Sequence, residues 1–134
     1  MIDKTHPSLA ITPLPTPLHL HQYPADSPLP PWASVPTPFL SITRTDEELS
    51  IVYASPRRHD DDATYEGPWR GLRVAGPMDL SMTGILNALT SPLKTAQVPI
   101  FALSTWNTDY VLVPWDRTAD AVAALRADGW TVGS

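Results

Sequence analysis

Apolar residues in this chain occur mostly in short runs or in alternation with polar ones, a pattern typical of β-strands. In "PLHLHQY", residues 17–23, leucines alternate with histidines, as in a half-buried strand. Further strands are predicted for "WRGLRVAG", "VPIFALS", "YVLVP" and "WTV", at residues 69–76, 98–104, 110–114 and 130–132.

Two helices are predicted between the strands of the C-terminal half. The first covers residues 83–96, where Pro92 is expected to kink or end it. Its apolar stripe at helical spacing consists of Ile85, Leu86, Leu89 and Leu93. The second begins at Asp116 or Thr118 and stops at Gly129. The resulting order β-α-β-β-α-β is that of a ferredoxin-like module.

A strand–turn–strand pattern occurs twice in the chain. "SITRTDEELSIV", residues 41–52, and "LSTWNTDYVLV", residues 103–113, both pass through a polar turn that contains Thr and Asp. Matching Thr43 to Thr105 aligns the copies with one extra residue in the first. This repeat predicts an α+β fold with two ferredoxin-like (βαββαβ) modules, the first shortened or degenerate because its helix signals are poor.

The prolines affect the domain organisation. Ten of the sixteen lie between Pro7 and Pro38, so this third of the chain cannot be one long helix or a central strand throughout. We therefore divide the chain into four segments. They are a proline-rich tail (1–16), a first module (17–55), a charged linker (56–67) and a second module (68–134).

The composition indicates a globular protein, for which the cytoplasm is the expected location. Hydrophobic residues make up 43% of the chain and charged residues 17%. A net charge of −5 argues against nucleic-acid binding, and no apolar run is long enough to span a membrane. The chain has no cysteine and no phosphate-binding glycine motif, so no disulfide and no cofactor is expected.

Three stretches resemble small stand-alone proteins with tandem ACT domains, which are related to the CASTOR cytosolic arginine sensors. They are "FLSITRTDEELSIV", "WRGLRVAGPMDLSMTGILNALTSPL" and "IFALSTWNTDYVLV". The resemblance covers roughly residues 18–132. It implies a regulatory, non-catalytic protein that binds an amino acid or similar small metabolite at the interface between modules. A regulated protein partner and a homodimer are expected, the latter also because module pairing would cover exposed sheet edges.

The resemblance also implies where the ligand binds. In the arginine sensors, a strand-end loop and a loop–helix junction form much of the pocket. The corresponding ligand-binding residues here are Asp79, Leu80, Ser81, Thr83, Gly84, Ile85, Thr105, Trp106, Asn107, Thr108 and Asp109. The helix N-terminus would offer N–H groups to a carboxylate, and Asp109 would bind an ammonium group or a cationic side chain. Trp106 would cover the aliphatic part of the ligand or stack on a cation.

Other interpretations of the same residues stay open at this point. Asp109 could bond N–H groups of its own turn, and Trp106 could belong to the core or to a dimer interface. Gly84 could serve close packing, and Thr83 could be an ordinary helix residue.

Other functions also stay open. A small enzyme on the same sheet could use His19, His21 or Asp109 as acid or base, and a pure interaction module would need no ligand. No metal site is expected at the two histidines or at "HDDD", residues 59–62, since no third ligand is evident and consecutive residues rarely converge on one ion.

Overall fold

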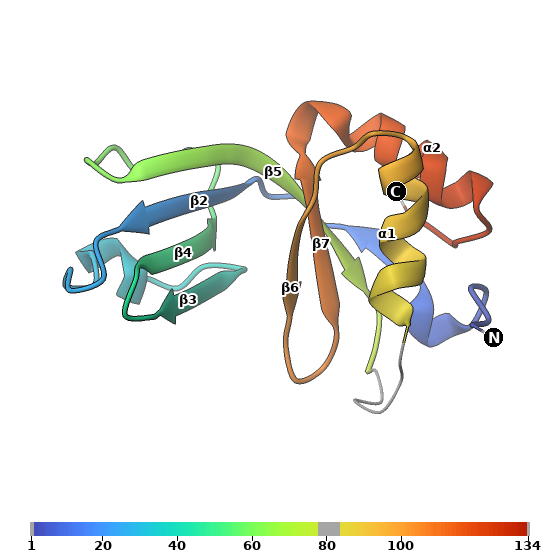
Figure 1. The fold of residues 1–134 in the computed structure, drawn as a ribbon, viewed down its shortest axis with the longest axis horizontal. Helices are drawn as coiled ribbons and strands as arrows, with labels where there is room; N and C mark the ends of the chain where they lie inside the picture. The colour runs from blue at the N-terminus through green and yellow to red at the C-terminus, as the bar shows by residue number, and fades with distance from the viewer. Residues whose placement is uncertain (1, 78–83, 134) are drawn as a thin grey trace. The chain divides into compact units, whose positions relative to one another are not determined.

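A computed structural model describes residues 2–77 and 84–133 as an α+β fold (Figure 1). Its strands are β1 (Ile11–Pro13), β2 (Leu18–Tyr23), β3 (Leu40–Arg44), β4 (Leu49–Ala54), β5 (Thr64–Val74), β6 (Phe101–Ser104) and β7 (Asp109–Pro114). Its helices are α1 (Ile85–Thr95) and α2 (Thr118–Ala127), with single 3-10 turns at Pro7–Leu9, Pro31–Ser34 and Trp115–Arg117. None of the helices described has the length and apolar character needed to cross a membrane.

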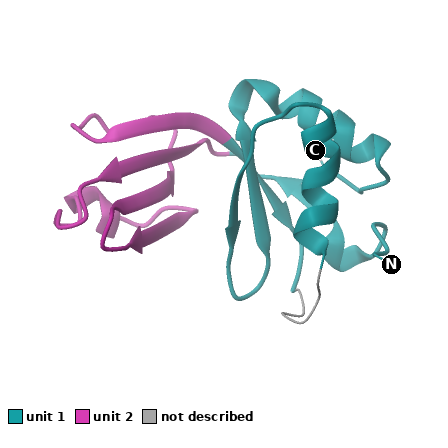
Figure 2. Cartoon of the chain, viewed as in Figure 1, with its two compact units in different colours: residues 1–15, 70–134 teal, residues 16–69 magenta. Residues whose placement is uncertain are grey.

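The chain divides into two compact units (Figure 2). Unit 1 contains residues 1–15 and 70–134, and unit 2 contains residues 16–69. The units differ from the segments predicted from the sequence, because residues 1–15 belong to the same unit as the C-terminal half. The predicted linker differs as well, since its last residues already belong to β5.

Unit 1 carries the predicted order β5-α1-β6-β7-α2. Its strands lie in the order β6-β7-β5-β1, and the pairs β6–β7 and β1–β5 are antiparallel. One hydrophobic core joins the helices to this sheet, through Leu72, Val74, Ile85, Leu89, Leu93, Val111, Val113, Ala121 and Leu125. The apolar stripe predicted for the first helix is therefore the face that packs on the sheet.

A proline in α1 and a glycine after α2, both residue types that disfavour helix, have different effects. Pro92 lies inside α1 without ending it, because it occurs in the last turns, and the next residue, Leu93, is fully buried in the core. Gly129 stops α2 as predicted: it has a left-handed φ of 98°, and its N–H donates to the carbonyl oxygen of Arg126.

The N-terminal segment is part of the unit 1 sheet, and not the separate tail that the sequence suggested. Ile11 pairs with Val74 of β5 and is 1% exposed. The expected closing strand at residues 130–132 is reduced to one parallel bridge, between Val132 and Ile11. Because β1 occupies the position beside β5, the chain end pairs with β1 instead.

Unit 2 is an antiparallel sheet in the order β3-β4-β2-β5. All of residues 16–69 are described, and they contain no α-helix, so the unit is not a complete βαββαβ module. The segment between β2 and β3 forms only the 3-10 turn at Pro31–Ser34. Six prolines between residues 24 and 38 explain this, since they remove backbone donors and fix φ.

The two predicted hairpins are present and have matching turns. The Thr45 N–H donates to the Glu48 carbonyl oxygen at 2.9 Å, and the Thr105 N–H donates to the Thr108 carbonyl oxygen at 2.9 Å. The equivalent residues are thus Thr45 and Thr105, sixty positions apart, and no extra residue separates the copies. The alignment through Thr43 was wrong, because it followed residue type where backbone pairing sets the register.

Candidate functional site

The turn between β6 and β7 is held against the end of β5. Thr108 is 5% exposed, and its hydroxyl donates a hydrogen bond to the carbonyl oxygen of Val74 at 2.7 Å. Val74 is the last residue of β5, and the chain leads from there toward α1. The bond therefore places the turn, residues 105–108, beside the start of the connection to α1, as a pocket built from both segments requires.

Two side chains, one in this turn and one at the start of β7, are available to a ligand in different ways. Trp106 is 82% exposed, which excludes it from the core. The half-buried Asp109 accepts a hydrogen bond from the Ser104 hydroxyl at 2.7 Å, across the hairpin. This bond orients one carboxylate oxygen, and a carboxylate has acceptor sites for several further donors.

The second predicted wall begins at Gly84, the residue before α1. Gly84 is exposed and left-handed (φ 80°), and with no side chain it cannot cap the N–H groups of the first turn. Ile85 is 2% exposed and packs in the core, so only its backbone could contact a ligand. The predicted residues Asp79, Leu80, Ser81 and Thr83 lie outside the described residues.

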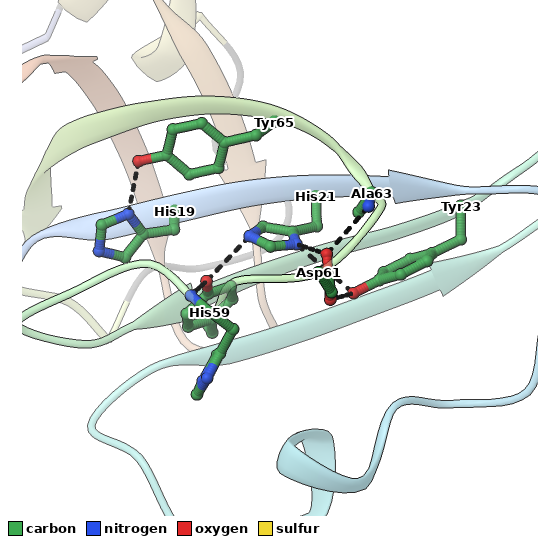
Figure 3. Close-up of polar contacts among 8 residues, drawn as sticks. His19, His21, Tyr23, His59, Asp61, Ala63 and Tyr65 are labelled. Carbon is green, nitrogen blue, oxygen red and sulfur yellow. Dashed lines mark hydrogen bonds and ion pairs between the residues drawn. The ribbon is translucent and has the colours of Figure 1, made fainter.

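A second concentration of polar groups lies in unit 2, on the buried face of β2 (Figure 3). We call it the histidine–tyrosine cluster, made of His19, His21, Tyr23, Tyr53, His59, Asp61 and Tyr65. His21 is 0% exposed and His19 is 4% exposed, so the histidines of β2, and not its polar Gln22, face the interior.

His21 is held between a carboxylate and a phenol. Its Nδ1 lies 3.3 Å from Asp61 Oδ1, and its Nε2 lies 2.9 Å from the Tyr53 hydroxyl oxygen. These partners assign the proton of neutral His21 to Nδ1, so that Nε2 accepts from the Tyr53 hydroxyl. That hydroxyl oxygen also accepts from the His59 N–H at 2.7 Å. Asp61 accepts from the Tyr23 hydroxyl at 2.5 Å as well.

His19 has partners for both of its ring nitrogens. Nε2 lies 2.9 Å from the Ser55 carbonyl oxygen, to which it must donate, and Nδ1 lies 2.8 Å from the Tyr65 hydroxyl. Because the carbonyl only accepts, neutral His19 carries its proton on Nε2 and accepts from Tyr65 at Nδ1.

The cluster shifts the pKa values of its members. Burial lowers the pKa of both His19 and His21, and for His21 it outweighs the nearby Asp61 charge, which acts in the opposite direction. The pKa of the Asp61 carboxyl is lowered even though burial opposes this, because Tyr23 and Ala63 donate hydrogen bonds to it. Burial raises the pKa of Tyr23 and of Tyr53. The cluster therefore favours neutral side chains at His19 and His21 and an ionised Asp61.

These contacts bear on the alternatives that the sequence left open. All four ring nitrogens of His19 and His21 are bonded within the protein, which favours a structural role over acid–base catalysis on a substrate. Within the described part of the chain, no three His, Cys, Asp or Glu side chains are arranged to hold a metal ion.

Sequence reasoning missed Asp61, because it occurs in the charged run at residues 59–62, which we expected to be a solvated linker. It also gave Tyr53 and Tyr65 no role. The sequence signal that could have indicated this cluster was a pair of histidines on one face of a strand, in a chain that also has a carboxylate in a loop.

The fold and the sequence of this chain are similar to those of known ACT-domain proteins. The model of the ACT-domain family matches residues 64–127, and a model of an N-terminal domain matches residues 22–57. The cytosolic arginine sensor for mTORC1 subunit 1 of Bos taurus is 34% identical over 64 residues, which are 46% of this chain and 20% of the sensor. The Rattus norvegicus sensor is 25% identical over 130 residues, 92% of this chain and 39% of the sensor. The chain thus spans less than half the length of these relatives.

Solved structures agree with this similarity. Protein Atu0741 from Agrobacterium tumefaciens is 31% identical, with a TM-score of 0.83 over 92% of this chain and 91% of that one. The Vibrio cholerae protein VC0802, described as a possible transport protein, is 11% identical, with a TM-score of 0.70 over 91% of both chains. At that identity, the second likeness concerns the fold alone.

Proposed function

We propose that this chain, which belongs to the ACT-domain proteins and is distantly related to the cytosolic arginine sensors, is a non-catalytic regulator that binds an amino acid or a similar small metabolite. The relatives' names support this class of ligand. They also describe cytosolic proteins, in keeping with the cytoplasmic location predicted from the sequence.

The proposed site lies in unit 1, between the β6–β7 turn and the segment that leads to α1. The observation that carries it is the hydrogen bond from the Thr108 hydroxyl to Val74, which holds the turn at the end of β5. In this proposal Asp109 binds the ligand's ammonium group or a cationic side chain. The N–H groups in the first turn of α1, which Gly84 has no side chain to cap, bind the ligand's carboxylate.

Trp106 gives the proposed site an apolar cover. A tryptophan that is 82% exposed at the tip of a hairpin loses contact with water when it closes over a ligand, which favours binding. Binding would then change which partner surfaces pack together, and in this way a regulator would report a metabolite. The partner is the regulated protein expected from the sequence.

The first experiment is a thermal-shift screen of the full chain against the twenty amino acids. A ligand present at about 100 times its dissociation constant stabilises the folded state by roughly 2.7 kcal/mol, which raises the melting temperature by several degrees. Asp109→Asn keeps an acceptor for Ser104 but removes the charge. We expect it to weaken binding by roughly tenfold or more.

Asp46→Ala is the matched control, since Asp46 lies in the equivalent turn of unit 2 and is exposed. It should leave the shift unchanged. A shift that survives Asp109→Asn in full would remove Asp109 from the site. If no amino acid or related metabolite changes the melting temperature, the proposed function is wrong and an interaction module becomes the better description.

A further inference from the structure

A hollow of about 280 Å³ lies in unit 2 beside the histidine–tyrosine cluster. Its lining includes the aromatic rings of Trp32, Tyr53 and His59, with Val35, Pro36 and Leu40 around them. The Trp32 and His59 rings are stacked, with centroids 4.3 Å apart and planes 16° from parallel. The Trp32 and Tyr53 centroids lie 4.5 Å apart. The aromatic residues of the lining are therefore packed against one another.

Two hydroxyl groups in this lining are already bonded to the protein. The Thr37 hydroxyl donates to the Ala54 carbonyl oxygen at 2.6 Å. The Tyr53 hydroxyl contacts His21 Nε2 and accepts from the His59 N–H. Apart from the imidazole nitrogens of His59, a ligand would thus meet mainly aliphatic and aromatic carbon, which suits an apolar, aromatic ligand more than a strongly hydrated one.

Exposed apolar side chains also line the hollow. Val35 is 59% exposed and Leu40 is 39% exposed, although both are large and hydrophobic. Covering such side chains with an apolar ligand removes their surface from water, which favours binding.

The wall formed by His59 is fixed in place before any ligand arrives. Its backbone N–H is bonded to Tyr53, and Asp61, two residues later, is bound by His21, Tyr23 and the Ala63 N–H (Figure 3). A loop that is already ordered adds little entropy loss when a ligand binds. The buried cluster thus explains how an exposed loop can keep one face of a binding site in position.

We propose that unit 2 contains a binding site for a small planar aromatic molecule, in the hollow that Trp32, Tyr53 and His59 line together with Val35 and Leu40. This site is separate from the amino-acid site proposed in unit 1. Its volume lies near the lower limit of the roughly 300–1,000 Å³ usual for ligand pockets, so the ligand is a single ring system. Stacking and edge-to-face contacts favour an aromatic ring over a saturated ring of the same size by about two- to tenfold.

The test is a pair of NMR titrations of the full chain, with benzyl alcohol and with cyclohexylmethanol. The two probes have the same heavy-atom skeleton and hydroxyl group and differ only in aromaticity. In ¹H–¹⁵N spectra we expect benzyl alcohol to shift the amide signals of Val35, Thr37, Leu40 and His59. Its affinity should be about two- to tenfold higher than that of cyclohexylmethanol. The amide signals of residues 105–108 in unit 1 should not move.

Two variants and a control make the test specific. His59→Ala removes one ring but keeps the backbone N–H that binds Tyr53. Val35→Asp places a charge in the lining at an exposed position where the fold tolerates it. Each should weaken benzyl alcohol binding at least about threefold, while His6→Ala in unit 1 should leave it unchanged.

Three results would overturn the proposal. They are an absence of shifts at the pocket amides, equal affinities for the two alcohols, and unchanged binding in both variants. If His59→Ala unfolds unit 2, Val35→Asp decides the question. None of these outcomes depends on Asp109, so the proposed function in unit 1 stands or fails independently.

Discussion

His21 shows how one buried residue organises its surroundings. It contacts Asp61 from the loop, Tyr53 from β4 and the rings of Trp32 and Tyr65, and Arg58 and His59 act on it through their charges. The alternation of leucine and histidine correctly predicted a strand with one buried face. It did not show which face is buried, because hydropathy treats histidine as polar whatever partners the fold provides.

Stability should depend on pH through His19 and His21. Their pKa values in the folded protein are lowered by burial, so the unfolded chain binds more protons as the pH falls below the ordinary histidine value of about 6.5. The stability that these two histidines contribute is therefore complete above that pH. It is lost as the pH falls toward their pKa values in the folded protein. We expect the melting temperature to decrease between pH 7.5 and pH 5.5, measured by circular dichroism.

The double variant His19→Gln/His21→Gln should flatten this dependence, and His6→Gln should not. The lowered pKa of Asp61 affects stability in a separate pH range, below the ordinary aspartate pKa of about 3.9. A melting temperature that rises on acidification, or a slope unchanged in the double variant, would contradict the assignment to the two buried histidines.

Among the elements, β1 is the one that local sequence patterns failed to predict. It has three residues and ends at a proline, so it offers too short an alternation to recognise. Its position depends on β5, whose edge it covers, and on the chain end that bridges to Ile11. The elements α1, α2 and β7 and the second half of β5 were predictable because each places apolar residues at regular spacing in one core, whereas the first half of β5 is mostly exposed.

Replacing Ile11 with alanine tests whether β1 is structural. Ile11 is 1% exposed within the unit 1 core, so we expect the substitution to lower the free energy of unfolding by about 2–5 kcal/mol. Urea denaturation would measure this loss. Thr12→Ala on the exposed side of the same strand is the control, and it should change stability by less than about 1 kcal/mol. Equal effects would mean that β1 is not packed as described.

For the whole molecule, we keep the prediction that two chains associate. β3 lies at one end of the strand order of unit 2 and β6 at one end of that of unit 1, and such strands present backbone groups for pairing. Light scattering coupled to size-exclusion chromatography should give a mass near twice the 14.7 kDa of one chain.

A lysine placed on each edge strand in turn would show which strand forms the contact between two chains. Ala102→Lys on β6 and Thr43→Lys on β3 are both exposed positions, and the substitution at the edge that pairs should return the protein to a monomer. If the unmodified chain has the mass of a single chain at every concentration tested, the homodimer prediction is wrong.

The sequence by itself determined the two helices and the β6–β7 turn of the ACT domain and the β3–β4 turn of unit 2, because these depend on the spacing of neighbouring residues. The tertiary structure alone decided where the polar side chains meet. Thr108 bonds a residue 34 positions away, and Tyr23 bonds Asp61 from 38 positions away. Such contacts depend on which strands pair and in which register, and no local pattern encodes that choice. For the same reason, the hollow beside His59 appeared only once the chain was folded.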